Sequence, residues 1–326
     1  MSLSRNAARR CRHVLAAVVA VAALAACGGG TSQFEAFIAG RVIAFGDETT
    51  AITAGGKKYS TNATVASTDA SGETVYTPDC LSQPNWVQSL AGVYGFVFAE
   101  CNPGNVEAPQ AIMRATPGAR VADIQVQVDA QLAGGGFRDK DLVALLAGAN
   151  DIIELYQQFP GRSETDLLAE AGQRGRLLAQ QVNRLVEYGA KVIISTVPDM
   201  GLTPYALKQR LEFVGSGDRA ALLSRLTTAF NEQLGVNILL DGRFVGLVQA
   251  DLRTQAMVRS PGSFGLVNVT NAVCVETAPL PDCDDQTLVQ PGAAGVFMWA
   301  DDLRLAYGGQ LQIGNLAADR ARRNPF

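Results

Sequence analysis

Histidine is almost absent from this chain of 326 residues. The single histidine, His13, lies in an N-terminal stretch that we expect to be removed on export, so the exported part has none. This absence excludes catalysis by a serine–histidine pair, in which the imidazole takes the proton of the nucleophile. Because C-x-x-C pairs are missing as well, the sequence predicts neither a zinc site nor a cofactor.

Clusters of positive charge are also missing from the exported part. The formal net charge of the whole chain is -4, and its first 26 residues contain four arginines and no acidic residue. The remaining chain therefore carries a formal charge of -8. An acidic chain without a basic cluster is not expected to bind nucleic acid.

Long hydrophobic runs are missing except for one near the N-terminus. Residues 14–26 are almost wholly apolar, but thirteen residues are too few to span a bilayer, and basic residues precede them, as in a secretion signal. The run ends in Leu24-Ala25-Ala26-Cys27, which resembles the lipobox of bacterial lipoproteins, whose cysteine becomes the N-terminal residue and carries the lipid. An ordinary signal peptide that happens to contain a cysteine is the alternative.

From this resemblance we expect a signal peptide at 1–26, a lipid-anchored flexible tether at 27–38 and a single domain at 39–326. The membrane is then a partner through the lipid on Cys27. Since Gly28 rather than aspartate follows the cysteine, nothing indicates retention at the inner membrane. The expected location is the bacterial envelope, at the outer membrane facing the periplasm or at the cell surface.

Four cysteines remain after the signal and Cys27 are set aside, namely Cys80, Cys101, Cys274 and Cys283. An even number in an oxidising compartment indicates disulfides, and four cysteines allow three pairings. We predict Cys80–Cys101 and Cys274–Cys283, because each of these closes one local loop.

Apolar runs of strand length alternate with helical patterns along the exported chain. The predicted strands are 41–45, 110–114, 141–147, 191–196 and 243–249, and the predicted helices are 164–188, 217–234 and 307–322. The run 92–99 fits either a strand or a buried helix. Such alternation predicts an α/β fold of three layers, with a mostly parallel sheet of about five strands between two layers of helices. Ligands bind beyond the carboxyl ends of such strands, where we expect four segments to meet: 46–48, 117–120, 148–151 and 198–201.

Four sequence blocks resemble those of the SGNH/GDSL hydrolase superfamily and occur in the same order. "FGDETT" (45–50) stands where that family has F-G-D-S, and "ATPGARVAD" (115–123) resembles its second block. "LAGAND" (146–151) resembles G-x-N-D, and "WADDLRLAYGGQ" (299–310) resembles the final block, W-x-D-x-x-H-P. The resemblance implies a flavodoxin-like three-layer domain with an esterase-like site. In that site Gly118 and Asn150 would donate to the oxyanion, and Asp301 would be the triad aspartate.

The chain departs from this family at the two residues that move the proton. Glu48 stands at the position of the nucleophilic serine, Arg304 at that of the histidine, and Leu305 replaces the proline that usually follows. Triad residues act as a unit, and their loss typically lowers the rate by roughly 10⁴- to 10⁶-fold. We therefore expect a catalytically inactive relative of these esterases, in which Glu48 and Arg304 form an ion pair.

Other readings of the same residues remain open. Glu48 and Asp301 could act as a pair of carboxylates on esters or glycans, although a neighbouring arginine keeps carboxylates ionised. Lys57 and Lys58 could supply a base, but two lysines in a glycine-rich segment are more often a solvated turn. The possible functions are thus an inactive protein that binds an acyl, glycan or cell-envelope ligand, an ester- or glycan-acting hydrolase with an unconventional site, and a structural envelope lipoprotein. Asp151 is expected to cap a helix and Asp199 to lie in a turn.

Overall fold

The computed structural model describes residues 37–215 and 217–326. Residues 37–326 form one compact unit. The predicted signal peptide, the lipid site at Cys27 and most of the tether lie outside the described residues. Among the described residues, no helix is both long and apolar enough to cross a membrane.

A sheet of five parallel strands forms the centre of this unit. Its strand order is β4-β1-β5-β6-β7, and each strand pairs in parallel with its neighbours. The bounds are β1 Arg41–Gly46, β4 Ala111–Met113, β5 Asp141–Leu146, β6 Lys191–Ser195 and β7 Val245–Val248. Every residue of β1 and β5 is buried, as expected for strands covered on both faces. The predicted three-layer α/β fold with about five parallel strands is confirmed.

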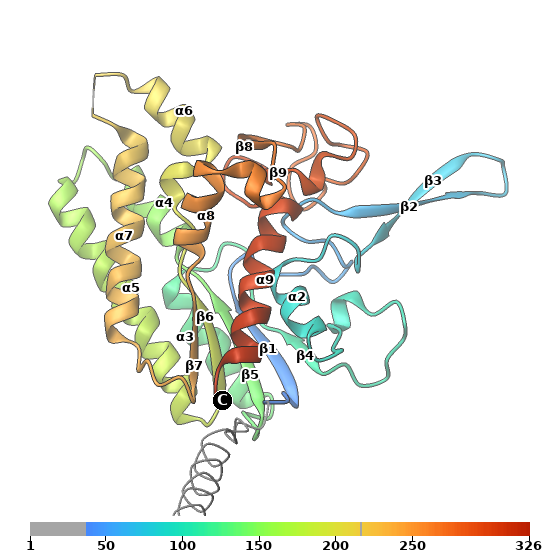
Figure 1. Cartoon of the computed structure of the whole chain (residues 1–326), viewed down its shortest axis with the longest axis horizontal. Coiled ribbons are helices and arrows are strands. Elements are labelled where there is room, and N and C mark those ends of the chain that lie inside the picture. The colour runs from blue at the N-terminus through green and yellow to red at the C-terminus, as the bar shows by residue number, and fades with distance from the viewer. Residues whose placement is uncertain (1–36, 216) are drawn as a thin grey trace, which may run out of the picture. The chain divides into compact units, whose positions relative to one another are not determined.

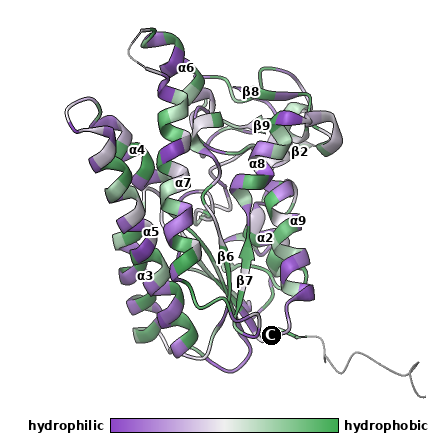
Figure 2. Cartoon of the chain, turned by 60° about the vertical axis from the view of Figure 1, so that its left-hand side comes forward, coloured by the Kyte–Doolittle hydropathy of each residue, from purple (hydrophilic) through white to green (hydrophobic). Residues whose placement is uncertain are grey.

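Helices cover both faces of the sheet, as Figure 1 shows. One layer contains α3 Val121–Ala133, α4 Ala149–Gln157, α5 Glu164–Glu187 and α7 Arg219–Asn237, and the other contains α2 Trp86–Gly92, α8 Ala250–Arg259 and α9 Tyr307–Arg323. Alternate residues of β1 pack against opposite layers of helices. Ile43 and Phe45 pack against the first layer, and Val42 and Ala44 against the second. The hydrophobic sides of these helices face inward in Figure 2.

Smaller elements surround this core. They are the strands β2 Ala63–Thr68, β3 Thr74–Asp79, β8 Asn268–Ala272 and β9 Phe297–Trp299, the helix α6 Pro204–Glu212, and the 3₁₀ turns η1 Ala99–Cys101, η2 Met200–Leu202, η3 Pro261–Phe264 and η4 Ala293–Gly295. Strands β2 and β3 form an antiparallel hairpin that extends away from the sheet in Figure 1.

The run 92–99 is neither the strand nor the buried helix that its composition allows. Helix α2 begins earlier, at a capping box in which Asn85 and Gln88 bond reciprocally, and ends at Gly92. The chain then turns through Gly95, which has a positive φ of 71°. The apolar side chains of the run belong to a loop, where Phe98 is buried against the core. Composition alone did not indicate the cap that starts the helix.

The structure contains both predicted disulfides. Cys80 bonds to Cys101 across 21 residues, and Cys274 bonds to Cys283 across nine. The first ties the end of the hairpin to η1, since Cys80 directly follows β3. The second closes the loop after β8, which forms a wall of a cavity described below.

Candidate active site

Three of the four segments that were expected to meet at the carboxyl end of the sheet are joined there by hydrogen bonds. Glu48 follows β1, Gly118 lies between β4 and α3, and Asn150 is in the first turn of α4. The fourth segment, 198–201, follows β6, and the side chain of Asp199 accepts hydrogen bonds from Ser224 and Gln255 rather than from a residue of the other three segments. Its expected position in a turn is correct, since it begins the 3₁₀ turn η2. The loop between β9 and α9, which carries Asp301 and Arg304, also lies beside Glu48.

One oxygen of Glu48 fills the position that the resemblance assigns to an oxyanion. Glu48 Oε2 accepts hydrogen bonds from the Gly118 backbone N–H at 2.8 Å and from Asn150 Nδ2 at 2.9 Å. In an acyl hydrolase such donors stabilise the charge that develops on the substrate carbonyl. Here the carboxylate of the chain itself uses both of them.

The other oxygen of Glu48 pairs with Arg304. Glu48 Oε1 accepts from Arg304 Nη2 at 2.9 Å and from Nε at 3.2 Å, so the expected ion pair is present. Arg304 also donates from Nη1 to Asp301 Oδ2 at 3.1 Å. The second oxygen of Asp301 accepts from the backbone N–H groups of Leu303 and Arg304, which fixes the loop. The row Glu48–Arg304–Asp301 thus stands where serine, histidine and aspartate would be aligned.

The charges at this site follow from burial and pairing. Burial alone would raise the pKa of the Glu48 carboxyl, but Arg304 and the hydrogen bonds from Asn150 and Gly118 outweigh it, so this pKa lies below its usual value. Burial would lower the pKa of the Arg304 guanidinium, yet Asp301 and Glu48 raise it overall. Both groups are therefore charged at neutral pH.

The pKa of Asp47, which precedes Glu48 in the chain, shifts in the opposite direction. Burial, and then the neighbouring charge of Glu48, raise its pKa well above the usual value. Its Oδ1 accepts from the Thr49 backbone N–H. Its side chain is fully buried, so Asp47 presents no surface to a ligand in the cleft.

Two glycines allow the close approach on which the site depends. Gly46, at the end of β1, has φ +139°, and a Cβ there would lie 2.1 Å from the carbonyl oxygen of Leu146. Gly148, at the start of α4, has φ +124°, and its Cβ would lie 2.5 Å from Phe230. At both positions a larger residue would be strained by the positive φ, and its Cβ would collide with backbone at Gly46 and with the Phe230 side chain at Gly148.

Asp151 does cap a helix, but a different one from the helix that contains it. Its Oδ2 accepts from the Val121 backbone N–H at 2.9 Å, at the start of α3, and Arg174 binds its other oxygen at 3.2 Å. Asp151 thereby joins the beginnings of α3 and α4. Gly118 and Asn150, which precede these helices or begin them, are held in register with each other.

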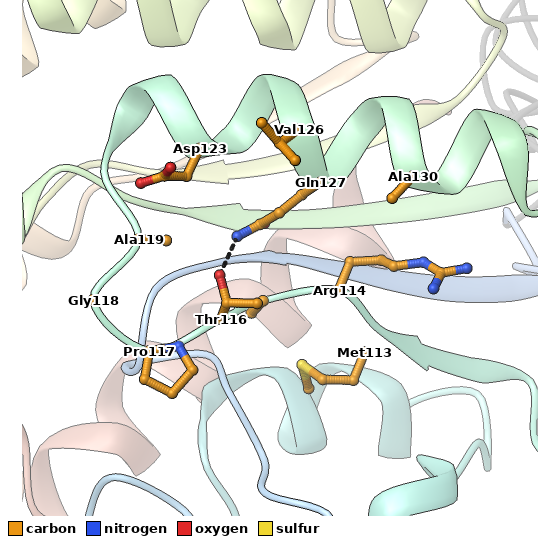
Figure 3. Close-up of a pocket in the computed structure, with 11 residues that line it drawn as sticks. Met113, Arg114, Thr116, Pro117, Gly118, Ala119, Asp123, Val126, Gln127 and Ala130 are labelled. Atoms are coloured by element: carbon orange, nitrogen blue, oxygen red, sulfur yellow. Dashed lines mark hydrogen bonds between the residues drawn. The ribbon is translucent and has the colours of Figure 1, made fainter.

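Gln127 is a positioning residue that the sequence analysis missed. It donates from Nε2 to the Gly46 carbonyl and to Thr116 Oγ1 and accepts from the Gly46 N–H. Figure 3 shows Gln127 reaching from α3 toward Thr116, at one side of a cavity of about 550 Å³ that extends to Gly118. A signal was available, because Gln127 lies on the same helical face as the apolar Ile124 and Val128.

A second cavity of about 760 Å³ adjoins the ion pair. Asp301 and Arg304 contribute to its lining from one side. Most of the other lining residues lie around the Cys274–Cys283 disulfide, including Val275, Ala278, Pro279, Leu280 and Val289. The lining is therefore apolar for the most part. The only other charged residues that line it are Lys208, Asp302 and Glu276, and the first two pair with each other.

The two lysines near the first block do not form a solvated turn. Lys57 is partly exposed and pairs with Asp282, but Lys58 is fully buried. Lys58 Nζ donates to the carbonyl oxygens of Cys80 and Ser82 at 3.2 and 3.0 Å. Burial lowers its pKa to about 8, against the opposing effect of nearby carboxylates. Lys58 therefore holds the Cys80 loop in place, and its hydrogen bonds go to Asn62, Cys80 and Ser82 rather than to the candidate active site.

The lowered pKa of Lys58 predicts a rise of stability with pH. Between about pH 8 and the unfolded value of 10.5, the unfolded chain binds a proton that the folded chain does not, so the free energy of unfolding increases with pH. We expect a slope of at most about 1.4 kcal/mol per pH unit from this group. Urea unfolding at pH 7 to 10 should show the rise in the parent and its loss in Lys58→Met. An equal rise in both proteins would contradict the assignment.

Among the described residues, no group of histidine, cysteine, aspartate and glutamate side chains is arranged to hold a metal ion.

The chain is similar to one known protein family. A family model described as GDSL-like Lipase/Acylhydrolase matches residues 42–254. The match includes Glu48, Gly118 and Asn150 but ends before Asp301 and Arg304, whose place in the site comes from the geometry above.

Several solved structures are similar to the chain at low sequence identity. An acetyl xylan esterase is 12% identical with a TM-score of 0.43, over 85% of this chain and 96% of that chain. A member of the lipolytic G-D-S-L family from Veillonella parvula is 12% identical with a TM-score of 0.41, over 86% and 96%. An acetylxylan esterase from Geobacillus stearothermophilus is 13% identical with a TM-score of 0.39, over 87% and 95%. No curated protein sequence matches the chain.

Proposed function

Since the chain belongs to the family of GDSL-like lipases and acylhydrolases, we propose that it is an exported lipoprotein that has lost ester hydrolysis and binds a ligand in the cleft beside Arg304. The observation that carries this proposal is the position of Glu48. Its carboxylate takes both oxyanion donors, Gly118 N–H and Asn150 Nδ2, and pairs with the residue at the histidine position.

The loss of hydrolysis follows from three properties of this arrangement. The hydroxyl nucleophile is absent at residue 48 and the imidazole at residue 304. Arginine stays protonated and cannot replace the imidazole as a general base. A substrate carbonyl would also have to displace Glu48 from its two donors before any charge on it could be stabilised.

The alternative of a carboxylate-based hydrolase has less support. Such chemistry needs one ionised carboxylate and one carboxylic acid with a raised pKa, both in reach of the substrate. Glu48 has a lowered pKa, and the two carboxyls near it whose pKa is raised by burial, Asp47 and Asp151, are both buried. Asp151 also accepts hydrogen bonds from Val121 N–H and Arg174. Both oxygens of Asp301 already accept hydrogen bonds, one from Arg304 and the other from two backbone N–H groups.

An ester assay with an oxyanion-donor variant tests the proposed inactivity. We expect the parent to hydrolyse p-nitrophenyl acetate no faster than Asn150→Ala, within about twofold. In an active enzyme, removal of one oxyanion donor typically lowers kcat by 10²- to 10³-fold. Turnover by the parent that disappears in Asn150→Ala, or in the isosteric Glu48→Gln, would show that the site is catalytic.

The ligand is expected to be an uncharged molecule with an apolar part and hydrogen-bonding groups, such as an acyl ester or an acylated glycan. The 760 Å³ cavity supports this chemistry, because most of its lining is apolar and four of its five charged residues belong to the pairs Lys208–Asp302 and Arg304–Asp301. A free anion would have to displace a carboxylate from Lys208 or Arg304, and Glu276 adds a further negative charge. A neutral ligand can form hydrogen bonds with the paired charged side chains without separating them.

Filling the cavity should abolish ligand binding. Val289 lines it with 55% of its surface exposed, so Val289→Trp can occupy the cavity without disturbing the core. Val267, which is 73% exposed and not part of this lining, provides the matched control Val267→Trp. In a thermal-shift screen of acyl esters and envelope glycans, we expect Val289→Trp to weaken binding at least about tenfold and Val267→Trp to leave it unchanged. A cavity that binds none of these classes would favour a purely structural envelope protein.

A further inference from the structure

The end of the unit opposite the candidate active site carries an apolar and basic surface. We define this basal surface by the segments 37–41, 134–141, 187–191, 236–244 and 319–326, around the points where β1, β5, β6 and β7 begin. Contacts join these segments: Gly40 N–H donates to the Lys140 carbonyl, Asn324 Nδ2 donates to the Gly242 carbonyl, and Phe37 packs edge-on against Phe326 at 5.3 Å. In Figure 1 the C-terminus marks this end, and α6, β8 and β9 lie at the other.

Four large aliphatic side chains of the basal surface face solvent. They are Ile38, Val236, Leu239 and Leu240, with exposed fractions of 68%, 74%, 58% and 60%. Three of them belong to the last turn of α7 and the loop that follows it. Single exposed aliphatic residues are ordinary, but a group gathered at one end points to an apolar partner.

The same surface is positively charged in an otherwise acidic protein. Its segments carry eight basic side chains, Arg41, Arg138, Lys140, Lys191, Arg243, Arg320, Arg322 and Arg323, and five acidic ones, Asp139, Asp141, Glu187, Asp241 and Asp319. The net charge of +3 here contrasts with -8 for the whole exported chain. Exposed aliphatic groups with surrounding basic residues are the features that bind a protein to the surface of an anionic bilayer.

We propose that the basal surface rests on the lipid bilayer that holds the anchor, which turns the ligand cleft toward the aqueous compartment. The position of Phe37 supports this occupant, because the chain that leads to Cys27 joins the unit at the basal surface. Only nine residues separate Cys27 from Phe37, which limits their separation to about 35 Å. The proposal rests on the proposed lipid anchor for its biological setting, but the affinity of the surface for lipid does not depend on the anchor.

Vesicle binding by an unlipidated chain tests the surface itself. The protein would comprise residues 27–326 with Cys27→Ser, which keeps the compact unit 37–326 entire. We expect it to sediment with vesicles of phosphatidylcholine and phosphatidylglycerol at 3:1, and about 0.5 M salt should release it because screening weakens the basic contacts. Leu239→Ser/Leu240→Ser should lower the partition coefficient at least about fivefold.

A variant at the opposite end provides the control. Leu211 and Val214 are 74% and 81% exposed, so Leu211→Ser/Val214→Ser removes a comparable aliphatic surface near α6. It should bind vesicles as the parent does. Absence of vesicle binding by the parent, or equal losses in the two double variants, would overturn the proposal. Mass spectrometry of the N-terminal peptide of the membrane-extracted full chain tests the lipid on Cys27 separately, so the two failures can be told apart.

Discussion

Replacing Glu48 by serine and Arg304 by histidine together should raise the rate of p-nitrophenyl acetate hydrolysis by on the order of 10² or more over the parent. The serine would supply the missing hydroxyl, and removal of the carboxylate would free Gly118 N–H and Asn150 Nδ2 for the substrate oxyanion. Asp301 already directs Oδ2 at residue 304, where a histidine would need it. The measurement is the initial rate under saturating ester.

The single substitutions provide the decisive comparison. Glu48→Ser without histidine has no base, and Arg304→His without serine has no nucleophile, so both should stay near the parent rate. The triple variant Glu48→Ser/Arg304→His/Asn150→Ala should lose most of the gain, because an oxyanion donor is missing. A folded double variant no faster than the single variants would show that more than these two residues has diverged, and Leu305, at the usual position of proline, would be the next candidate.

Much of the fold could be predicted because its signals are local. The buried runs of β1 and β5 are apolar at nearly every position, which a parallel sheet requires, and α5 has a regular apolar face with Gly189 at its end. The hairpin of β2 and β3 was missed since its exposed strands have no hydrophobic face to give a period. Residues 92–99 were misjudged because the start of α2 depends on a cap and not on hydrophobicity.

The site was predictable in its members but not in its contacts. Four ordered blocks named Glu48, Asn150 and Arg304, and the opposite charges of the first and last predicted their pairing. Nothing in the sequence indicated that Glu48 would also take the two oxyanion donors, because a glutamate side chain can adopt many rotamers. The partners of Asp151 and Lys58 were equally hidden, since each makes its contacts across the fold with backbone groups distant in sequence.

Removal of the arginine from the site should destabilise the fold strongly at neutral pH. The Glu48 side chain is only 6% exposed, so Arg304→Ala leaves a nearly buried carboxylate without its cation. Loss of one partner from such a pair typically costs about 3 kcal/mol. We expect a loss of that order at pH 7 in urea unfolding. The surface pair Arg225–Glu164, with side chains 48% and 38% exposed, gives the matched control, and Arg225→Ala should cost less than about 1 kcal/mol.

The pH dependence of this loss of stability identifies the Glu48 carboxylate as its cause. In the parent, the pKa of Glu48 lies below its usual value, so its contribution is present above the unfolded pKa of 4.5 and is lost as the pH falls through the folded pKa. In Arg304→Ala, burial raises the pKa of Glu48 and no arginine opposes this effect. The carboxylate therefore takes up a proton more readily, which removes the buried charge. The difference between parent and Arg304→Ala should therefore shrink as the pH falls below 5, whereas Arg304→Ala/Glu48→Gln should be more stable than Arg304→Ala at pH 7. A difference that is constant from pH 3 to pH 7 would mean that Arg304 stabilises the loop by packing and by its bond to Asp301, and not by holding the charge of Glu48 in the oxyanion position.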